Sequence, residues 1–244
     1  MKFYKRLPVI KALSFDLDDT LYDNIDAIKK AEIDFCTFLK DEYNLPQFAS
    51  NTSFWQEQRE KLLVNNPHIK HDVTEIRCQN LIETFKFLKV PDLSYSKALS
   101  LVKIFVKMRS KNIVIDERIY SLLDTLKSKY KIAAISNGNV DTKVLNLDKF
   151  FDYDLRPKVN TYKSKPCSDL FNLYARTINT NPCNILHVGD DPTTDVYGAI
   201  KANFSCAYVD RGYAKRLVGF KSLSYLPHVS LDSIYDLKEL LCVR

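Results

Sequence analysis

The sequence predicts an α/β fold, in which a parallel sheet carries helices on both faces and a block of helices interrupts the chain after the first strand. Short apolar runs with the character of buried strands alternate with helical patterns after residue 111. Residues 24–109 instead show helical periodicity and hardly any strand pattern. Alternating strands and helices are typical of parallel sheets covered on both sides. The chain has 244 residues, 45% of them hydrophobic, which is enough to bury such a core.

The first expected strand covers residues 9–15 (VIKALSF) and ends at the acidic segment of residues 16–20 (DLDDT). Three helices are then expected, each with apolar residues on one face at helical spacing. These faces contain Ile28, Ala31, Phe35 and Phe38; Cys78, Leu81, Ile82, Phe85 and Leu88; and Ala98, Leu101, Val102, Phe105 and Met108. The pattern Asp72-Val73-Thr74-Glu75 resembles a capping box and is expected to begin the second of these helices.

Strands and helices alternate in the second half of the chain. A helix is expected after Asp116, with a buried face made of Ile119, Leu122, Leu123, Leu126 and Tyr130. The elements expected after it are a strand over residues 131–135, a helix after Pro166, a strand over 184–188, a helix after Pro192, a strand over 205–209 and a closing helix over 231–241. We therefore expect residues 1–22 and 111–244 to form the sheet-containing core, and residues 23–110 to form a helical domain inserted into it.

Charge and cysteine content exclude several function classes. The 36 Lys and Arg residues exceed the 30 Asp and Glu residues and are scattered, so we expect no nucleic-acid or membrane partner. The six cysteines form no CxxC pair or zinc-ligand cluster, which favours free thiols. Lys11 interrupts the apolar stretch near the N-terminus, and no stretch has the roughly 18 apolar residues of a membrane-spanning helix. We expect a cytoplasmic protein that is a monomer or a weak dimer.

Polar clusters follow several expected strands, at the edge where open parallel sheets bind ligands. Asp16 and Asp18 come directly after the first strand and, by alternation, lie on the same side as the small residues Ala12 and Ser14. One such carboxylate can attack an electrophile while the other transfers a proton to the leaving group. An acidic turn or a helix cap would give the same motif, so this cluster by itself leaves both interpretations open.

Two shorter motifs follow. Ser136 and Asn137 come directly after the strand of residues 131–135, where a hydroxyl and backbone N–H groups could hold phosphoryl oxygens; a plain helix cap is the alternative. Lys165 precedes a proline at the start of a helix and could supply positive charge, although most lysines are exposed and Lys163 competes for the role.

An acidic motif, Gly189-Asp190-Asp191-Pro192-Thr193-Thr194-Asp195, follows the strand of residues 184–188. Clustered carboxylates at the end of a strand suit a hard cation such as Mg²⁺, which prefers oxygen ligands. Capping of the helix that begins at the proline is again the alternative interpretation.

In their order along the chain, the four motifs resemble the signature of the haloacid dehalogenase (HAD) superfamily: Asp-x-Asp-x-Thr, Ser-Asn, Lys-Pro and Gly-Asp-Asp-x-x-x-Asp. The resemblance implies a Rossmann-like core with a helical cap that closes over the site. Segments spread over nearly the whole chain are further similar to the bacterial flavin mononucleotide phosphatases: MKFYKRLPVIKALSFDLDDTLYDN, HDVTEIR, ISNGN, SKPCSDLF and ILHVGDDPTTDVYGAI. That similarity implies a Mg²⁺-dependent phosphomonoester hydrolase of riboflavin metabolism, acting on FMN, on 5-amino-6-(5-phospho-D-ribitylamino)uracil, or on both.

The resemblance also implies a role for each motif residue. Asp16 is expected to form an aspartyl-phosphate, and Asp18 to protonate the departing alcohol and later to activate water. Mg²⁺ is expected between the Asp16 carboxylate, the Asp18 carbonyl and Asp190. Asp191 is expected as an outer or alternative ligand, and Asp195 as a residue that orients the site. The residues expected to contact the phosphoryl group are Asp16, Leu17, Asp18, Ser136, Asn137 and Lys165.

Other functions remain open on sequence grounds. A dehalogenase or a phosphosugar mutase would share the fold, but the HAD dehalogenases generally lack the second acid, Asp18. A phosphatase for another metabolite, a sugar phosphate or a nucleotide, would share every motif. A non-enzymatic phospho-acceptor switch also uses aspartates at strand ends and a lysine, but it needs neither Asp18 nor a large helical insert.

Several other side chains are of types that could bind a ring or a metal. Three aromatic residues of the insert could stack on a flavin ring, although their helical positions are more typical of a core: Phe54, Trp55 and Tyr95. His68 and His71 are three residues apart but have no evident third ligand, so we expect loop polarity there rather than a metal site. His187 lies within a strand and is expected to be structural.

Overall fold

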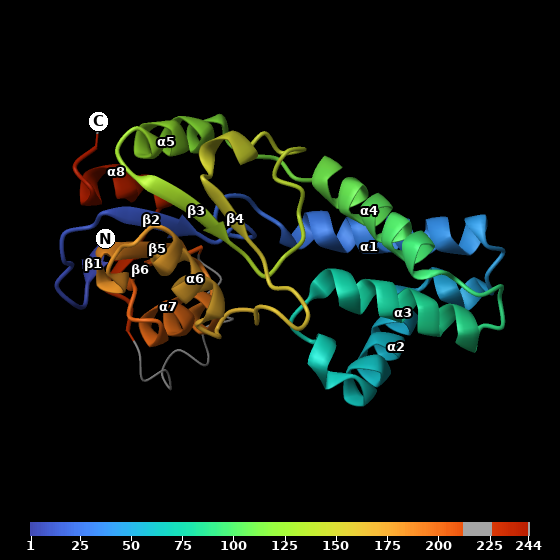
Figure 1. Cartoon of the computed structure of the whole chain (residues 1–244). Helices are drawn as coiled ribbons and strands as arrows, with labels where there is room; N and C mark the ends of the chain where they lie inside the picture. The colour runs from blue at the N-terminus through green and yellow to red at the C-terminus, as the bar shows by residue number, and fades with distance from the viewer. Residues whose placement is uncertain (212–225, 244) are drawn as a thin grey trace.

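The computed structural model (Figure 1) describes residues 1–211 and 226–243, and within them seven strands form one sheet in the order β1-β7-β6-β5-β2-β3-β4. The strands are β1 (Lys2–Phe3), β2 (Ala12–Phe15), β3 (Lys131–Ile135), β4 (Tyr153–Leu155), β5 (Ile185–Gly189), β6 (Ser205–Val209) and β7 (Val229–Leu231). Neighbouring strands are parallel except for β1 and β7, which pair antiparallel. The predicted α/β fold with a parallel sheet is confirmed.

Helices cover both faces of the sheet and form two hydrophobic cores with it. One core lies against α5 (Glu117–Lys127) and the short α8 (Leu237–Leu240), and the other against α6 (Asp169–Thr177) and α7 (Gly198–Lys201), on opposite sides of the sheet in Figure 1. Alternation along the strands divides the side chains between the cores. In β2 and β3, the first core takes Leu13, Phe15, Ile132 and Ala134, and the second takes Ala12, Ala133 and Ile135.

Four further helices form a group beyond the end of β2 (Figure 1), which we call the helical insert. They are α1 (Ile25–Glu42), α2 (Thr52–Asn65), α3 (Val73–Phe87) and α4 (Tyr95–Lys111). Their buried side chains make a hydrophobic cluster of their own, which includes Phe35, Leu39, Trp55, Leu81 and Phe105. The insert therefore has a core that is distinct from the two cores of the sheet.

The predicted start of α3 is confirmed. Asp72 accepts hydrogen bonds from the backbone N–H groups of Thr74 (3.0 Å) and Glu75 (3.1 Å). Asp116 caps α5 in the same way, through the N–H of Arg118 (2.9 Å). These caps satisfy donors that the first turn of a helix leaves without a partner.

Some elements are shorter than the sequence predicts. Pairing in β2 starts at Ala12 rather than at residue 9, α5 ends before Tyr130, and the helix expected after Pro166 starts at Asp169. The helix after Pro192 consists of a π-helical turn (Pro192–Tyr197) and then α7. Strands β1, β4 and β7 have no counterpart in the prediction, since two or three residues are too few for a period to show.

The predicted closing helix over residues 231–241 is wrong at its start. Leu231 ends β7, and helical structure begins only with the 3₁₀ turn Ile234–Asp236 that leads into α8. Ser233 sets this start, because its hydroxyl accepts from the N–H of Tyr235 (3.3 Å) while Asp236 accepts from the N–H of Ser233 (3.2 Å).

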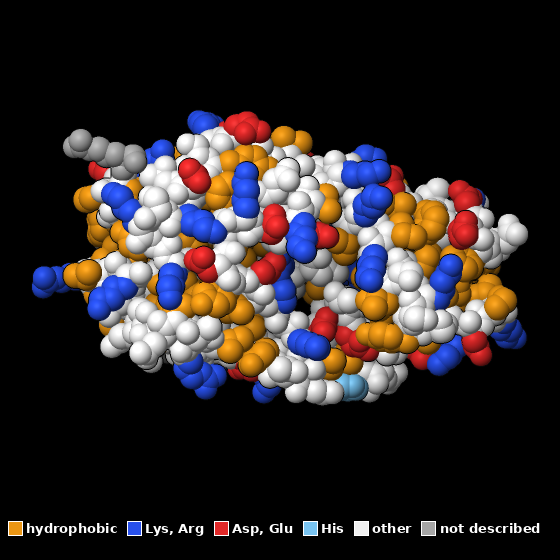
Figure 2. Space-filling view, turned by 45° about the horizontal axis from the view of Figure 1, so that its top comes forward, with side chains coloured by type: hydrophobic (Ala, Val, Ile, Leu, Met, Phe, Trp, Pro, Cys, Tyr) orange, Lys and Arg blue, Asp and Glu red, His pale blue; other side chains and the backbone are white. Residues whose placement is uncertain are grey.

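The surface and the thiols agree with the composition. Figure 2 shows side chains of both charges intermixed over the visible face. All six cysteines lie in the described residues with free thiols, as predicted. None of the helices within residues 1–211 and 226–243 is both long enough and apolar enough to traverse a bilayer.

Candidate active site

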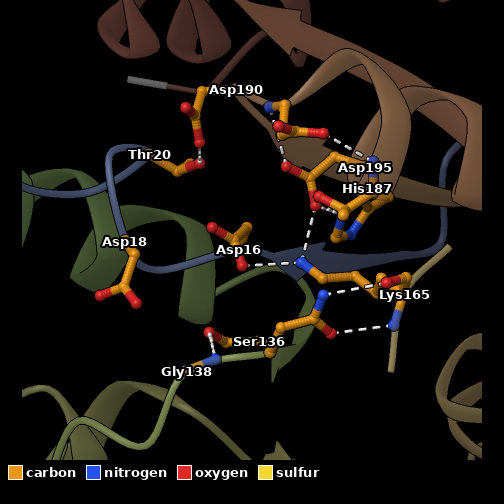
Figure 3. A network of polar contacts seen from close by, with 12 residues as sticks. Asp16, Asp18, Thr20, Ser136, Gly138, Lys165, His187, Asp190 and Asp195 are labelled. Atoms are coloured by element: carbon orange, nitrogen blue, oxygen red, sulfur yellow. Dashed lines mark hydrogen bonds and ion pairs between the residues drawn. The ribbon is translucent and has the colours of Figure 1, made fainter. Parts of the chain in front are cut away.

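Three neighbouring strands bring the predicted motifs to one edge of the sheet. β2 lies between β3 and β5, and both pairs are parallel. The backbone N–H of Asp16 continues the ladder by donating to the Val188 carbonyl (2.9 Å). The segments after these strands therefore meet, as Figure 3 shows for Asp16, Ser136 and Asp190.

Lys165 lies at the centre of this edge, with a side chain that is only 1% exposed. Its Nζ donates to Oδ1 of Asp16 and to Oδ1 of Asp195, at 2.6 Å each. Asn137 fixes the backbone of Lys165 by donating from Nδ2 to its carbonyl (2.9 Å) and accepting from its N–H (2.8 Å). The side chain of Asn137 is thus bound to the lysine segment. Lys163, the competing lysine, is exposed.

A buried polar chain holds Lys165 from the side of α6 and α7. Asp195 is fully buried and accepts from Lys165 and from Nε2 of His187 (3.2 Å). Although burial opposes ionisation, Lys165 and His187 hold the pKa of Asp195 below its usual range. Because that carboxylate only accepts, Nε2 of His187 carries a proton; burial lowers the pKa of His187, so its Nδ1 accepts from the Ser14 hydroxyl (2.9 Å). Gly189 leaves room for the chain, since a Cβ there would overlap the Asp195 side chain.

Three carboxylates converge beside Lys165. One oxygen each of Asp16, Asp190 and Asp195 lies within 4.8 Å of the others, and Thr20 holds Asp190 by donating from Oγ1 to Oδ1 (2.8 Å). Burial raises the pKa of Asp16 to about 7, against the opposing effect of Lys165. Burial, with the charges of Asp195 and Asp16, raises the pKa of Asp190 to about 8. When all three carboxylates are ionised they outnumber the single lysine, and this set of oxygen donors fits a hard divalent cation.

Asp18 is turned away from Asp16 in Figure 3. Its side chain is 21% exposed, and its Oδ1 accepts from the Tyr22 hydroxyl (2.8 Å) and from Nη2 of Arg109. On the other side, a Cβ at Gly138 would overlap Oδ2 of Asp18. The neighbouring hydroxyl, Oγ of Ser136, is buried at the end of β3 and accepts from the N–H of Gly138 (3.1 Å).

The chain matches known hydrolases over most of its length. A family model described as haloacid dehalogenase-like hydrolase matches residues 10–203. The chain belongs to the haloacid dehalogenase-like hydrolases. The predictions of this family and of a hydrolase enzyme are therefore confirmed.

Individual relatives extend the match of this HAD-like hydrolase to its full length. It is 32% identical over 243 residues to the 5-amino-6-(5-phospho-D-ribitylamino)uracil phosphatase YigB of Escherichia coli (strain K12), covering 99% of this chain and 100% of YigB. Human N-acylneuraminate-9-phosphatase is 21% identical over 239 residues, covering 95% and 94% of the two chains. The crystal structure of 2-haloacid dehalogenase from Pseudomonas syringae pv. Tomato DC3000 has the same fold, with a TM-score of 0.80, 24% identity and coverage of 96% and 99%.

Two of the residues expected at the HAD site direct their side chains elsewhere. Asp191 is exposed, and its Oδ1 accepts from the N–H groups of Thr193 (2.8 Å) and Thr194 (2.7 Å), so it caps the π-helical turn. Leu17 is buried in the core against α5 and α8, so only its backbone can face the site.

Arg109 and Tyr22 contact Asp18 but are absent from the sequence-based prediction for the HAD site. A signal for Arg109 was present in the sequence. It continues the buried face of α4 four residues after Phe105, and a charge on an apolar helix face needs a buried partner. The partner, Asp18, lies 91 positions away in the sequence and could not be identified without the fold.

The aromatic residues considered for ring stacking belong mainly to the core of the HAD insert. Trp55 is 8% exposed and packs edge to face against Phe54, with ring centroids 5.6 Å apart. Tyr95 is 48% exposed and donates its hydroxyl to Glu75 (2.7 Å). Trp55 also lines a cavity of about 60 Å³ inside the insert, whose other walls include Phe35, Arg77, Asn80 and Phe105.

The insert meets the core of this HAD-like hydrolase at the start of α3, and Figure 2 shows a hollow between the two parts. Nδ1 of His71 accepts from the hydroxyl (2.9 Å) and the N–H (3.3 Å) of Ser164, the residue before Lys165. Thr74 accepts from Nδ2 of Asn139 (3.3 Å). His68 is exposed, and among the described residues neither histidine belongs to a metal-ligand group.

Proposed function

We propose that this protein is a Mg²⁺-dependent phosphomonoester phosphatase that forms an aspartyl-phosphate on Asp16. The observation that carries the proposal is the buried contact between Lys165 and Asp16, beside the carboxylate of Asp190. A carboxylate and a phosphate dianion repel each other, so attack requires positive charge at the point of reaction. Lys165 lies against the attacking group, and the acidic cluster can bind a cation next to it.

In this proposal Asp16, Asp190 and the backbone carbonyl of Asp18 would hold Mg²⁺. Bound there, Mg²⁺ would neutralise charge on the phosphoryl oxygens. Asp195 would act by orienting Lys165, to which it is hydrogen-bonded at 2.6 Å. Asp191 would remain outside the ligand set, because its carboxylate caps a helical turn.

The chain's own residues then perform a two-step transfer. The Asp16 carboxylate attacks phosphorus, and the bond from phosphorus to the alcohol oxygen breaks as Asp18 gives that oxygen a proton. Asp18 next takes a proton from the water that attacks the aspartyl-phosphate, which restores Asp16 and releases inorganic phosphate. The phosphoryl oxygens would be held by Ser136, by Lys165 and by backbone N–H groups of the segments that follow β2 and β3.

We further propose FMN, 5-amino-6-(5-phospho-D-ribitylamino)uracil, or both as substrates, in riboflavin metabolism in the cytoplasm. The name and the full-length similarity of YigB support this substrate class. Residues 23–110 would form a cap that selects the leaving group above the core of residues 1–22 and 111–244. The similarity to N-acylneuraminate-9-phosphatase supports a sugar phosphate as the second candidate.

A phosphate-release screen tests the proposal. It would cover FMN, the ribitylaminouracil phosphate, sugar phosphates and nucleoside monophosphates, each with Mg²⁺ and after chelation by EDTA. We expect the highest kcat/KM for the two riboflavin-related esters and no turnover after chelation. If the riboflavin-related esters have a lower kcat/KM than the sugar phosphates, the substrate assignment is overturned, but the phosphatase assignment is not. A protein that retains one phosphoryl group without turnover would instead be a phospho-acceptor switch.

Binding of Mg²⁺ at the acidic cluster is expected to release protons near neutral pH. The pKa values of Asp16, about 7, and Asp190, about 8, are raised in the metal-free site, so these groups carry protons that a cation would expel. Affinity should therefore weaken as the pH falls below about 8. Calorimetry in buffers of different protonation enthalpy measures the release, and Asp190→Asn should reduce both release and affinity. An affinity that does not change with pH would contradict this prediction.

A further inference from the structure

Arg109 joins three points of the chain that are far apart in sequence. It is 2% exposed and lies in the last turn of α4, where the insert returns to the core. Its Nε donates to Oδ1 of Asn24 (2.8 Å), the residue that precedes α1 at the other end of the insert. Its Nη2 donates to Oδ1 of Asp18. One side chain therefore connects both ends of the insert to the second acid of the site.

The two oxygens of Asp18 have different surroundings. Oδ1 accepts from two donors, Arg109 and the hydroxyl of Tyr22 (2.8 Å), and Tyr22 is itself buried. Oδ2 faces Gly138, where a Cβ would overlap it. The absence of a side chain at Gly138 keeps space around Oδ2, while the two donors fix the plane of the carboxyl group through Oδ1. Arginine suits such a task, because its rigid fork can hold two acceptors in a set geometry.

The direction of Asp18 fits transfer to a leaving group. Attacking and leaving oxygens lie roughly in line across phosphorus, so the leaving oxygen is on the far side from Asp16. An acid that serves this oxygen must therefore be turned away from Asp16, as Asp18 is in Figure 3. We propose that Arg109 is a positioning residue, which holds Oδ1 of Asp18 so that Oδ2 faces the leaving oxygen and ties this alignment to the two ends of the insert. This inference rests on the phosphatase function proposed above.

The test compares leaving groups. A p-nitrophenolate departs without protonation, whereas an alkoxide needs an acid. kcat/KM covers substrate binding and the steps up to departure of the leaving group, so the comparison of the two esters isolates the requirement for proton transfer. For Arg109→Met we expect kcat/KM to fall on the order of 10²-fold for the alkyl ester that the screen ranks first, and by less than about tenfold for p-nitrophenyl phosphate.

Conservative variants guard against a loss of folding. Tyr22→Phe removes one hydroxyl from Oδ1 of Asp18 and should show the same selectivity with a smaller loss. Arg109→Lys keeps the charge but cannot hold Asn24 and Asp18 together, so we expect an intermediate loss. Arg118→Met removes an exposed arginine of α5 and should leave kcat/KM unchanged for both esters. Melting temperatures would identify variants that fail to fold.

The outcomes separate this inference from the function on which it rests. A wild-type protein that hydrolyses neither ester overturns the phosphatase proposal, and the inference with it. A wild-type protein that hydrolyses both, with folded Arg109 and Tyr22 variants that lose equally on both esters, overturns only the positioning role. The positioning role is supported if a folded variant at Arg109 or Tyr22 loses kcat/KM selectively for the alkyl ester.

Discussion

Replacing Asp16 by Asn is expected to abolish turnover, with a loss on the order of 10⁴-fold or more in kcat. The amide is a poor nucleophile, and the substitution also removes one of the three carboxyl groups that converge beside Lys165. Steady-state phosphate release measures the effect, and Asp16→Ala serves as a second variant that cannot revert to a carboxylate by deamidation. Turnover within about tenfold of wild type would contradict the role of Asp16 as nucleophile.

The stability of the same variant provides an internal check. Burial raises the folded-state pKa of Asp16 from its ordinary value of 3.8 to about 7, so this group costs the fold stability as the pH rises from about 4 to about 7, and the loss levels off above that. Asp16→Asn lacks that ionisation. We therefore expect its melting temperature, relative to wild type, to increase between about pH 5 and about pH 8 in EDTA. A variant that is inactive because it is unfolded would show no melting transition at either pH.

Replacing Lys165 by Met should lower both turnover and stability. The loss of the cation beside the attacking carboxylate is expected to reduce kcat on the order of 10²–10³-fold. Asp16 and Asp195 would then be buried without their shared partner, and breaking a buried pair in this way costs about 3–5 kcal/mol. Chemical denaturation and phosphate release would measure the two effects separately.

Two further variants identify the cause. Lys163 is exposed and lies two residues before Lys165, so Lys163→Met should leave turnover and stability unchanged. Lys165→Met combined with Asp195→Asn should recover stability, because one uncompensated charge is removed, but it should not recover turnover. Equal losses in the Lys163 and Lys165 variants would show that a general charge effect, not the buried contact with Asp16, supports the reaction.

Much of the fold is predictable because it depends on the period of the apolar residues. Residues 131–135 and 205–209 are the observed bounds of β3 and β6, and Asp72 caps α3 as its motif predicts. The three-residue strand β4 is only half-buried, so its apolar pattern is too weak to identify it. The last helix begins later than its apolar pattern predicts, because the cap at Ser233 has no apolar signature.

The candidate site is also predictable from the sequence only in part. The positions of Asp16 and Asp190 follow from strand ends that meet at one edge, which the order of the strands along the chain can predict. Lys165 lies in the segment between β4 and α6, and only its Lys-Pro motif identifies it. The contacts that orient these side chains do not follow from the order of the strands. Asn137 binds the backbone of Lys165, and Arg109 reaches Asp18 across 91 positions of sequence. Such long-range contacts depend on the path of the chain in three dimensions, and no local sequence pattern predicts that path.

The Asn24–Arg109 contact also determines at which residues the helical insert can be exchanged for that of a relative. Because the insert leaves and re-enters the core at one place, its helices can be exchanged for those of a relative without cutting any strand of the sheet. A graft of residues 25–108 would retain the hydrogen bond between the two junctions and its connection to Asp18. A graft of residues 23–110 would replace both partners, so a chimera with altered substrate preference would also inherit a differently oriented acid. The junctions suited to domain exchange thus lie just inside the two ends of the insert.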